Sequence, residues 1–381
     1  MTTETIDPTG IATETIDPTG IATETGTRTK TGTGAGSGTG AGSGTGAGTF
    51  TEPGPSTASS ELRRSIGLVL ALTVVLSALL TLFAWPAINS KPRHLPIVVS
   101  GPVAATSAMK TALNAQDPGA FSITTVGSAA AASERVKHHE AYGGYVYTAE
   151  GVQVLTSSAR SATVAQLLAQ IGTAAGARQH LPVVQSDIVP APVDDPHGAG
   201  IAASMLPVAM GSIVVAAATT FLIKRRRDRA LVVAAFAVLS GLALTALLQG
   251  WLGTLSGNYF ANATVIALGV GAVSMTLLGF ESLIGTTGLG LGSALMMLAG
   301  NALSGATTAP EMLPTGWGAA GQLLPLGATN TALRATAFFD GYGALRPLLV
   351  SAVWLLIGFS LQLVAAARRR RRHPRHLAHA H

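Results

Sequence analysis

The sequence contains no cysteine and few charged side chains. Of its 381 residues, 11% are charged, 5% are aromatic and 48% are hydrophobic, whereas soluble domains carry about 25% charged residues. Without cysteine there can be no disulfides, thiolate metal sites or cysteine nucleophiles. The scarcity of charge excludes an ordinary soluble enzyme. The net charge of +6 comes from short basic runs beside long apolar stretches, so it bears first on membrane topology.

Residues 1–60 are almost devoid of large apolar side chains. The segment TETIDPTGIA at 4–13 recurs at 14–23, and Thr-Gly-Ala-Gly-Ser units run to Gly48. Such a composition cannot offset the entropy of ordering the chain. The polar start is unlike a signal peptide, and no Gly-x-x-x-x-Gly-Lys-Ser/Thr phosphate loop occurs. We expect a disordered, low-complexity cytoplasmic tail.

Six segments are apolar over the length of about 20 residues that a helix needs to cross a bilayer. They are continuous runs without the alternation of a membrane β-barrel strand. The sequence therefore predicts an α-helical integral membrane bundle of six transmembrane helices with an inserted extracytoplasmic α/β domain. The segments are Ile66–Trp85, Ile201–Ile223, Ala230–Leu252, Ala263–Leu283, the glycine-rich Gly288–Thr308, and Leu348–Ala367.

Basic residues orient these segments in the membrane. Runs of Lys and Arg lie before the first segment, between the second and third (224–229) and after the last (368–375). Because cytoplasmic loops are enriched in Lys and Arg, both termini are predicted to be cytoplasmic. Each run borders an apolar segment, so its expected partner is the lipid bilayer. Nucleic-acid binding is a weak alternative, and we expect no nucleic-acid partner.

The polar stretch between the first two apolar segments alternates between strand and helix patterns. Strands are predicted at 94–100, 121–126, 142–147, 152–156 and 183–189, and helices at 103–115, 129–139 and 162–175. This βαβαββαβ order predicts a mixed sheet covered by helices. The predicted boundaries are a tail at 1–60, a first transmembrane helix at 61–86, the extracytoplasmic domain at 87–200, a five-helix membrane domain at 201–367 and a basic cytoplasmic tail at 368–381.

No constellation of residues indicates catalysis. His138, His139 and Glu140 form the densest titratable cluster, but adjacent residues point about 100° apart on a helix and do not match a zinc motif. We interpret them as a solvated helix end, and the C-terminal histidines as part of a flexible basic tail. The prediction is a protein that is not an enzyme and that uses no cofactor or metal.

The most specific pattern follows the fifth apolar segment. Asn301-Ala-Leu-Ser304-Gly305 precedes Pro310-Glu-Met-Leu-Pro314, and Gln322-Leu-Leu-Pro325 leads to Leu333-Arg334. Residues 200–367 resemble the ABC-2 type transporter permeases, in which a proline-rich segment between the fifth and sixth spans dips back into the membrane. The arrangement of one span, a large outer insertion and five further spans also resembles the phage-infection-protein type of membrane protein.

This resemblance implies a permease subunit of an export system in the bacterial plasma membrane. Its substrate would be an amphiphilic or cell-envelope compound, its partner a separate ATPase, and its assembly a homodimer. Two features depart from the pattern: the chain has no nucleotide-binding motif, and its first inner loop, 224–229, is too short for a coupling helix. A non-transporting scaffold or receptor, whose outer domain binds a partner, is the alternative. A membrane-bound enzyme ranks below both.

Candidate transport or packing residues follow from the same pattern. Glu281 is an ionisable group inside a predicted span, either paired at the inner interface or part of a substrate path. Asn301 suits a hydrogen bond between helices. The segment 309–345 is expected to be re-entrant, with an ordinary outer loop as the alternative. The full set is Glu281, Asn301, Ser304, Gly305, Pro310, Pro314, Pro325 and Arg334.

Overall fold

The structure is a computed structural model that describes residues 55–372. The chain divides into two compact units, Met1–Leu62 and Arg63–His381. The contacts discussed below all lie within the second unit. Most of the predicted N-terminal tail, and the histidines after residue 372, fall outside the described residues.

The first helix, α1 (Pro55–Ile88), begins before the predicted boundary at residue 61. The helix thus includes residues 55–60, which the sequence analysis assigned to the tail. Proline is favoured at the first helical position, and alanine, glutamate and leucine follow it here. None of the residues in the apolar window of α1 is buried, so its side chains are free to face lipid.

The α/β domain has the predicted order of elements. It contains β1 (Leu95–Ser100), α2 (Val103–Gln116), β2 (Phe121–Val126), α3 (Ala129–Lys137), β3 (Gly143–Tyr147), β4 (Val152–Thr156), α4 (Ala162–Gln179) and β5 (Val183–Asp187). The sheet order is β2-β1-β3-β4-β5, in which only the β3–β4 pair is antiparallel. The predicted mixed sheet is confirmed.

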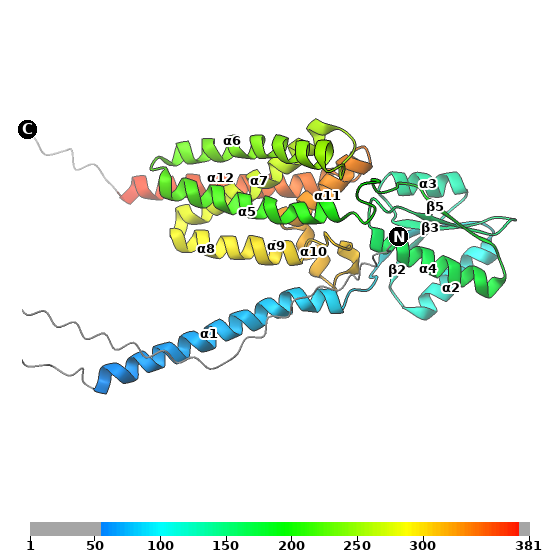
Figure 1. The fold of residues 1–381 in the computed structure, drawn as a ribbon, viewed down its shortest axis with the longest axis horizontal. Coiled ribbons are helices and arrows are strands. Elements are labelled where there is room, and N and C mark those ends of the chain that lie inside the picture. The colour runs from blue at the N-terminus through cyan, green and yellow to red at the C-terminus, as the bar shows by residue number, and fades with distance from the viewer. Residues whose placement is uncertain (1–54, 373–381) are drawn as a thin grey trace, which may run out of the picture. The chain divides into compact units, whose positions relative to one another are not determined.

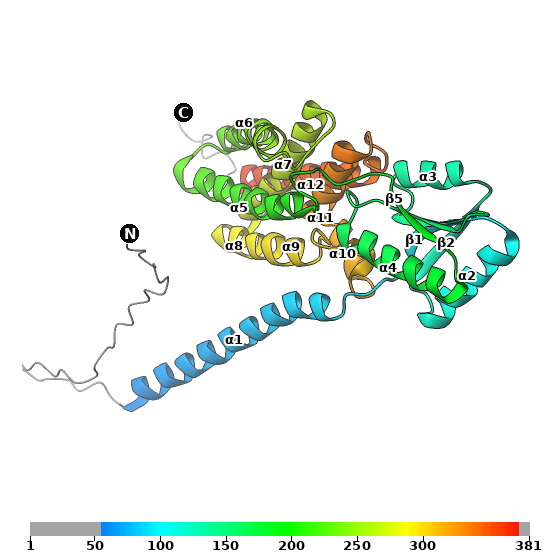
Figure 2. The ribbon, with the colours of Figure 1, turned by 45° about the vertical axis from the view of Figure 1, so that its right-hand side comes forward.

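Helices cover both faces of this sheet (Figure 2). One face packs with α2 and α4, through Leu113 and Leu168 against β1, β3 and β4. The other packs with α3, through Ala132 and Val136. The central strands β1, β3 and β4 therefore bury both of their faces, as expected for strands that are connected through helices, whereas the edge strands β2 and β5 contain no buried residue.

The second part of the chain is a helical bundle (Figure 1). Its central helix, α7 (Tyr259–Ile284), packs against α5 (Ala199–Leu222), α6 (Arg226–Thr245), α11 (Pro325–Phe338) and α12 (Leu345–Arg372). A π-helical stretch, Ala246–Trp251, extends α6. Small residues let α7 approach its neighbours closely. Gly269 lies against Thr329 of α11, and Gly279 against Gly358 of α12.

Among residues 55–372, five helices, and not six, are long and apolar enough to cross a membrane: Ser60–Ile88, Ala199–Leu222, Arg226–Trp251, Tyr259–Ile284 and Leu345–Arg369. The predicted fifth span, Gly288–Thr308, is the one that fails. It forms α8 (Thr286–Ala294), a π turn (Leu295–Ala299) and α9 (Gly300–Ala302). Gly305 then takes a left-handed φ of 67°, so the helix stops short of the required length.

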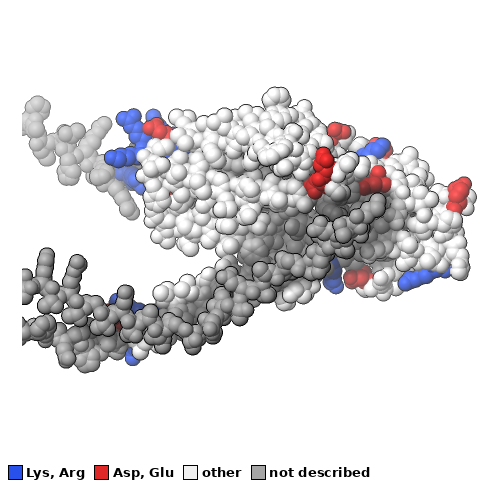
Figure 3. All heavy atoms as spheres, viewed as in Figure 1, with Lys and Arg blue, Asp and Glu red and all other residues white. Residues whose placement is uncertain are grey.

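Basic residues gather at one end of the bundle. The short link between α5 and α6 lies there, and Arg369 near the end of α12 is close enough to affect Arg226 electrostatically. Figure 3 shows Lys and Arg collected at this end, beside a surface almost free of charge over the helices. The end of α7 is also here, since Glu281 pairs with Arg226 and Arg229. The segment 286–302 must then return the chain to the opposite end, where α12 begins.

A helical hairpin fills the bundle at that opposite end. A 3-10 turn (Pro310–Met312) precedes α10 (Trp317–Gln322), and a tight turn leads into α11. In that turn the carbonyl of Leu323 accepts a 2.7 Å hydrogen bond from Trp354 Nε1. Trp354 lies about 14 Å along α12 from its first residue, at 1.5 Å per residue. The α10–α11 turn therefore lies well along the length of the bundle, on its exposed surface, where Leu323 is 56% exposed. From there α11 runs back with most of its residues buried.

Candidate functional site

The α/β domain and the bundle meet at a polar junction. From the domain side, Arg93 donates to the carbonyls of Met312 (3.0 Å) and Leu313 (2.7 Å). From the bundle side, Arg334 of α11 donates to the carbonyl of Ala159 (3.1 Å) in the domain and to that of Ala306 (2.9 Å). Two arginines thus tie the domain to the segment that contains the hairpin.

A cavity of about 200 Å³, which we call the junction cavity, lies at this contact. Tyr142 at the start of β3 donates a 2.7 Å hydrogen bond to Glu311 Oε2. The guanidinium of Arg160 lies 3.8 Å from the centroid of the Tyr142 ring and donates to the carbonyl of His139 at 2.9 Å. The remaining lining comes from α11, from residues 305–311 and from the start of α12: Gly305, Thr308, Ala309, Pro310, Gln322, Asn330, Thr331, Arg334, Gly343, Arg346 and Pro347.

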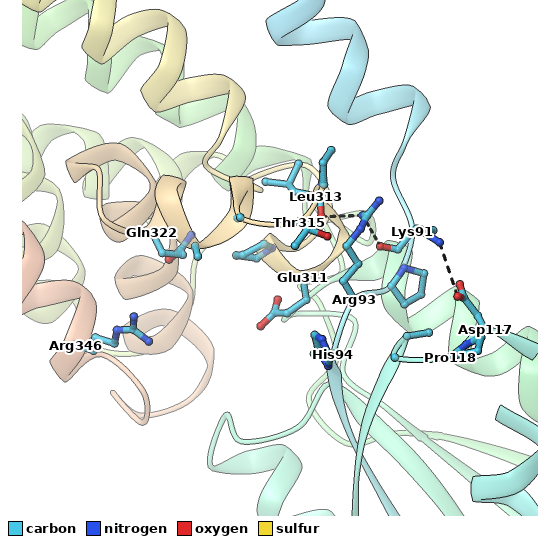
Figure 4. A pocket seen from close by; sticks show the side chains of 18 residues that line it. Lys91, Arg93, His94, Asp117, Pro118, Glu311, Leu313, Thr315, Gln322 and Arg346 are labelled. Carbon is cyan, nitrogen blue, oxygen red and sulfur yellow. Dashed lines mark hydrogen bonds and ion pairs between the residues drawn. The ribbon is translucent and has the colours of Figure 1, made fainter. Parts of the chain in front are cut away.

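A second and larger cavity, the outer cleft of about 530 Å³, adjoins the first. The two share Pro310, Glu311, Gln322 and Arg346 as lining. In Figure 4, Lys91, Arg93, His94 and Asp117 line the cleft from the domain side, facing Glu311, Gln322 and Arg346 from the bundle side. Lys91 and Asp117 form an exposed ion pair at 3.8 Å, so Arg93 is the remaining cation on this side of the cleft.

The junction cavity is more positively charged than the outer cleft. Arg160, Arg334 and Arg346 line it, and Glu311 is its one acidic side chain among the described residues. Burial and the nearby Glu311 carboxylate raise the pKa of the Tyr142 hydroxyl. The hydroxyl therefore stays protonated and remains the donor to Glu311.

His139 is neutral in the folded protein. Burial, followed by the positive charges of Arg160 and Arg334, lowers its pKa well below the ordinary value. Its ring packs edge-on against Phe339 at 4.6 Å, while the neighbouring His138 stacks on Tyr342 at 4.2 Å. The interpretation of this cluster as a solvated helix end holds for His138, the C-cap of α3, and for the half-exposed Glu140. It was wrong for His139, whose left-handed φ of 60° turns the chain into the junction.

The junction is expected to weaken as the pH falls. Because the pKa of His139 is depressed by folding, the unfolded chain binds a proton near pH 6.5 that the folded chain does not. Stability is then retained above that pH and lost below it, by about 1 kcal/mol at pH 5.5. Melting temperatures at pH 8 and 5.5 should show a steeper fall in the wild type than in His139→Asn, whose side chain tolerates a left-handed backbone. Equal slopes would contradict this assignment.

Seven of the eight residues predicted from the sequence lie in or beside this region. Arg334, Gly305 and Pro310 line the junction cavity, and Pro314 lines the outer cleft. Pro325 is buried at the first position of α11. Asn301 and Ser304 line a separate cavity of about 840 Å³ beside the start of α5, and Ser304 Oγ donates to the carbonyl of Asn301 at 2.8 Å.

Glu281 lies apart, at the basic end of the bundle. It is 9% exposed, and its carboxylate lies 3.6 Å from Arg226 and 3.3 Å from Arg229. Arg226 also hydrogen-bonds Ser282, the next residue of α7. Two roles were predicted for Glu281, an ion pair at one end of the span and a place in a substrate path. The structure brings together the partners for the ion pair, Arg226 and Arg229 of α6.

Replacing Glu281 with glutamine is expected to destabilise the protein by about 2 kcal/mol, because two partly buried guanidinium groups lose their counter-charge. The change should appear as a lower melting temperature in detergent. The matched control, Asp228→Asn, removes an exposed carboxylate from the same first turn of α6 and should have little effect. If Glu281→Gln abolished transport at unchanged stability, the structural role would be refuted.

Sequence reasoning did not identify Tyr142, Arg160 or Glu311 as site residues. Glu311 lies inside the quoted proline motif, so a signal for it existed. Arg160 is an isolated base in a loop before α4, and nothing local indicates that it would meet residues of α11. Within residues 55–372, no group of three His, Asp or Glu side chains could hold a metal ion.

Neither a family model nor a curated protein matches this sequence.

Proposed function

We propose that this chain is the membrane permease subunit of an ABC-2 type export system. The observation that carries the proposal is the α10–α11 hairpin, a half-length buried helix that enters the bundle from one end beside α7 and α12. Irregular backbone at membrane depth is tolerated where it is buried in protein or lines a wet cavity. Discontinuous helices of this kind are typical of substrate pathways in transporters.

The buried polar side chains of α11 support this role. Thr329, Asn330 and Arg334 are all less than 9% exposed, although the helix lies among apolar spans. Polar groups inside a membrane protein are costly, and they are commonly retained where they face a pathway or another helix. The hairpin would form the outer gate, with the junction cavity above it.

The proposed orientation places the basic end of the bundle in the cytoplasm of a bacterial cell. The short helix 286–302 would act as a sixth, shortened crossing, which puts both termini inside and the α/β domain outside. The absence of cysteine allows a direct test with single-cysteine variants. Glu150→Cys should react with an impermeant maleimide in intact cells, and Asp228→Cys only after lysis.

The energy would come from a separate ATPase, since no phosphate-binding motif occurs in the sequence. The link between α5 and α6 contains only Ile223–Arg225, too little for a coupling helix. Docking would use another basic surface at this end, such as the region around Glu61–Arg64 or the C-terminal basic run. A homodimer would complete the pathway, with the uncovered apolar side of α1 facing lipid or the second copy.

The decisive experiment is reconstitution in liposomes with an ATPase that copurifies from the native membrane. We expect ATP hydrolysis to rise several-fold in the presence of this chain, and to fall when the hairpin is immobilised by cysteine cross-linking between α10 and α12. Unchanged hydrolysis would refute the permease assignment.

A second candidate function is a non-transporting receptor or scaffold. It is favoured by the firm attachment of the α/β domain through Arg93 and Arg334, which suits a fixed binding surface. This candidate predicts that no ATPase is stimulated and that cross-linking the hairpin leaves partner binding by the outer domain intact.

A further inference from the structure

The junction cavity contains an excess of positive charge that the protein does not neutralise. Arg160 is 9% exposed and Arg334 is 8% exposed, and within residues 55–372 no carboxylate lies within ion-pair distance of either. Asp195 faces Arg334, but its two oxygens already accept the backbone N–H groups of Ala199 and Gly200 at 2.7 Å. Buried charges are normally paired, so this arrangement calls for an anion.

Two buried polar atoms in the cavity wall also lack hydrogen-bond partners. One is the donor Nε of Arg160, and the other is the acceptor Oδ1 of Asn330, a residue that is only 2% exposed. Such groups are rare, because an unmade buried hydrogen bond costs about 1–3 kcal/mol. Their positions in one cavity indicate a ligand that both accepts and donates.

The three guanidinium groups reach the cavity from three different elements. Arg160 comes from the loop before α4, Arg334 from α11 and Arg346 from the start of α12. Arg346 is exposed and has no ion pair or hydrogen bond within the described chain. A planar carboxylate is satisfied by one guanidinium fork. Donors that converge from three sides instead suit a tetrahedral anion with oxygens in several directions.

We propose that the junction cavity binds a phosphate group, free or as part of a phospholipid head group. The phosphate oxygens accept from Arg160 Nε and from Arg346, and Arg334 supplies charge. A phosphate hydroxyl, or a hydroxyl of a glycerol ester, donates to Asn330 Oδ1. Glu311 keeps its negative charge while it accepts from the Tyr142 hydroxyl, but the three guanidinium groups outnumber it and leave the lining with net positive charge. The inference holds whether or not the chain exports anything.

Binding can be measured on the full chain in a phosphate-free detergent. Calorimetric titration with inorganic phosphate and with glycerol 3-phosphate should show one saturable site. We expect Arg346→Gln to weaken binding by about tenfold or more, the usual effect of losing a charge-assisted contact. Asn330→Asp, which places a negative charge in the cavity at almost constant shape, should abolish binding. Arg178→Gln removes an exposed base at the end of α4 and serves as the matched control.

A second experiment distinguishes free phosphate from a phospholipid head group. Native mass spectrometry of the chain with added phosphatidylglycerol tests the head group. Retention of one lipid by the wild type and its loss in Asn330→Asp, without heat from the soluble anions, would support the lipid form. Because Arg346 is exposed, its substitution keeps the fold intact and the test valid even if Asn330→Asp fails to fold. The proposal is overturned if neither soluble anion nor lipid binds, or if Arg346→Gln binds as tightly as Arg178→Gln.

Discussion

Replacing Gly358 with alanine is expected to destabilise the helical bundle by about 3 kcal/mol, an overpacking penalty at the upper end of the usual range. A Cβ atom at this position would overlap the backbone of Met275 and come within 2.5 Å of the amide nitrogen of Thr276. Gly279 faces the same crossing and lies close to the carbonyl of Gly358. The atoms that a Cβ at Gly358 would meet belong to the backbone of α7, so no side-chain rotation relieves the overlap.

The matched control for this substitution is Gly290→Ala. Gly290 is also helical and within the bundle sequence, but a Cβ atom there would meet nothing within 4 Å. Because alanine has the higher helix propensity, this variant should gain up to about 1 kcal/mol. Unfolding of both variants in mixed detergent micelles should give shifts of opposite sign. Equal stability of Gly358→Ala and the wild type would mean that α7 and α12 are not packed as described.

The membrane helices and the sheet could be predicted from sequence because their signals are local. A run such as Ile201–Ile223 shows its length and hydropathy without reference to the rest of the chain. The strand at 121–126 and the hairpin at 142–156 likewise follow from β-favouring runs between turn residues. The fifth span misled the prediction because hydropathy does not register where a helix ends: the apolar run extends to Thr308, but the helix ends at Ala302, before the left-handed Gly305.

Only part of the candidate site could be predicted from the sequence, because many of its contacts join residues that are far apart in the chain. The proline motif and Arg334 stand out within about 35 residues of sequence, and the structure gathers most of them at one end of the bundle. Their partners come from far away: Arg334 reaches Ala159, and Glu311 meets Tyr142. No periodicity or spacing predicts which loop of one domain will meet a helix of another, so such cross-domain contacts require the structure.

Replacement of Arg334 is also expected to lower the stability of the protein strongly. Substitution by alanine would remove both hydrogen bonds that join α11 to the α/β domain and to Ala306, leaving two buried carbonyls unsatisfied. Charge-assisted hydrogen bonds contribute about 1.5–3 kcal/mol each, but Arg334 also carries a buried charge whose removal relieves a desolvation cost. We therefore expect a net loss of about 3 kcal/mol.

Hydrogen exchange would show which segments lose stability in Arg334→Ala. Amides of residues 157–161 and 305–311 should exchange faster in Arg334→Ala, while those in the centres of β1 and β3 keep their protection, because the sheet retains its own core. Arg334→Lys keeps the charge but lacks the planar fork, so it should recover only part of the protection. If exchange rose uniformly over the sheet, the arginine would be stabilising the domain itself. If it rose only at the junction, Arg334 would be the contact that couples α11 to the α/β domain.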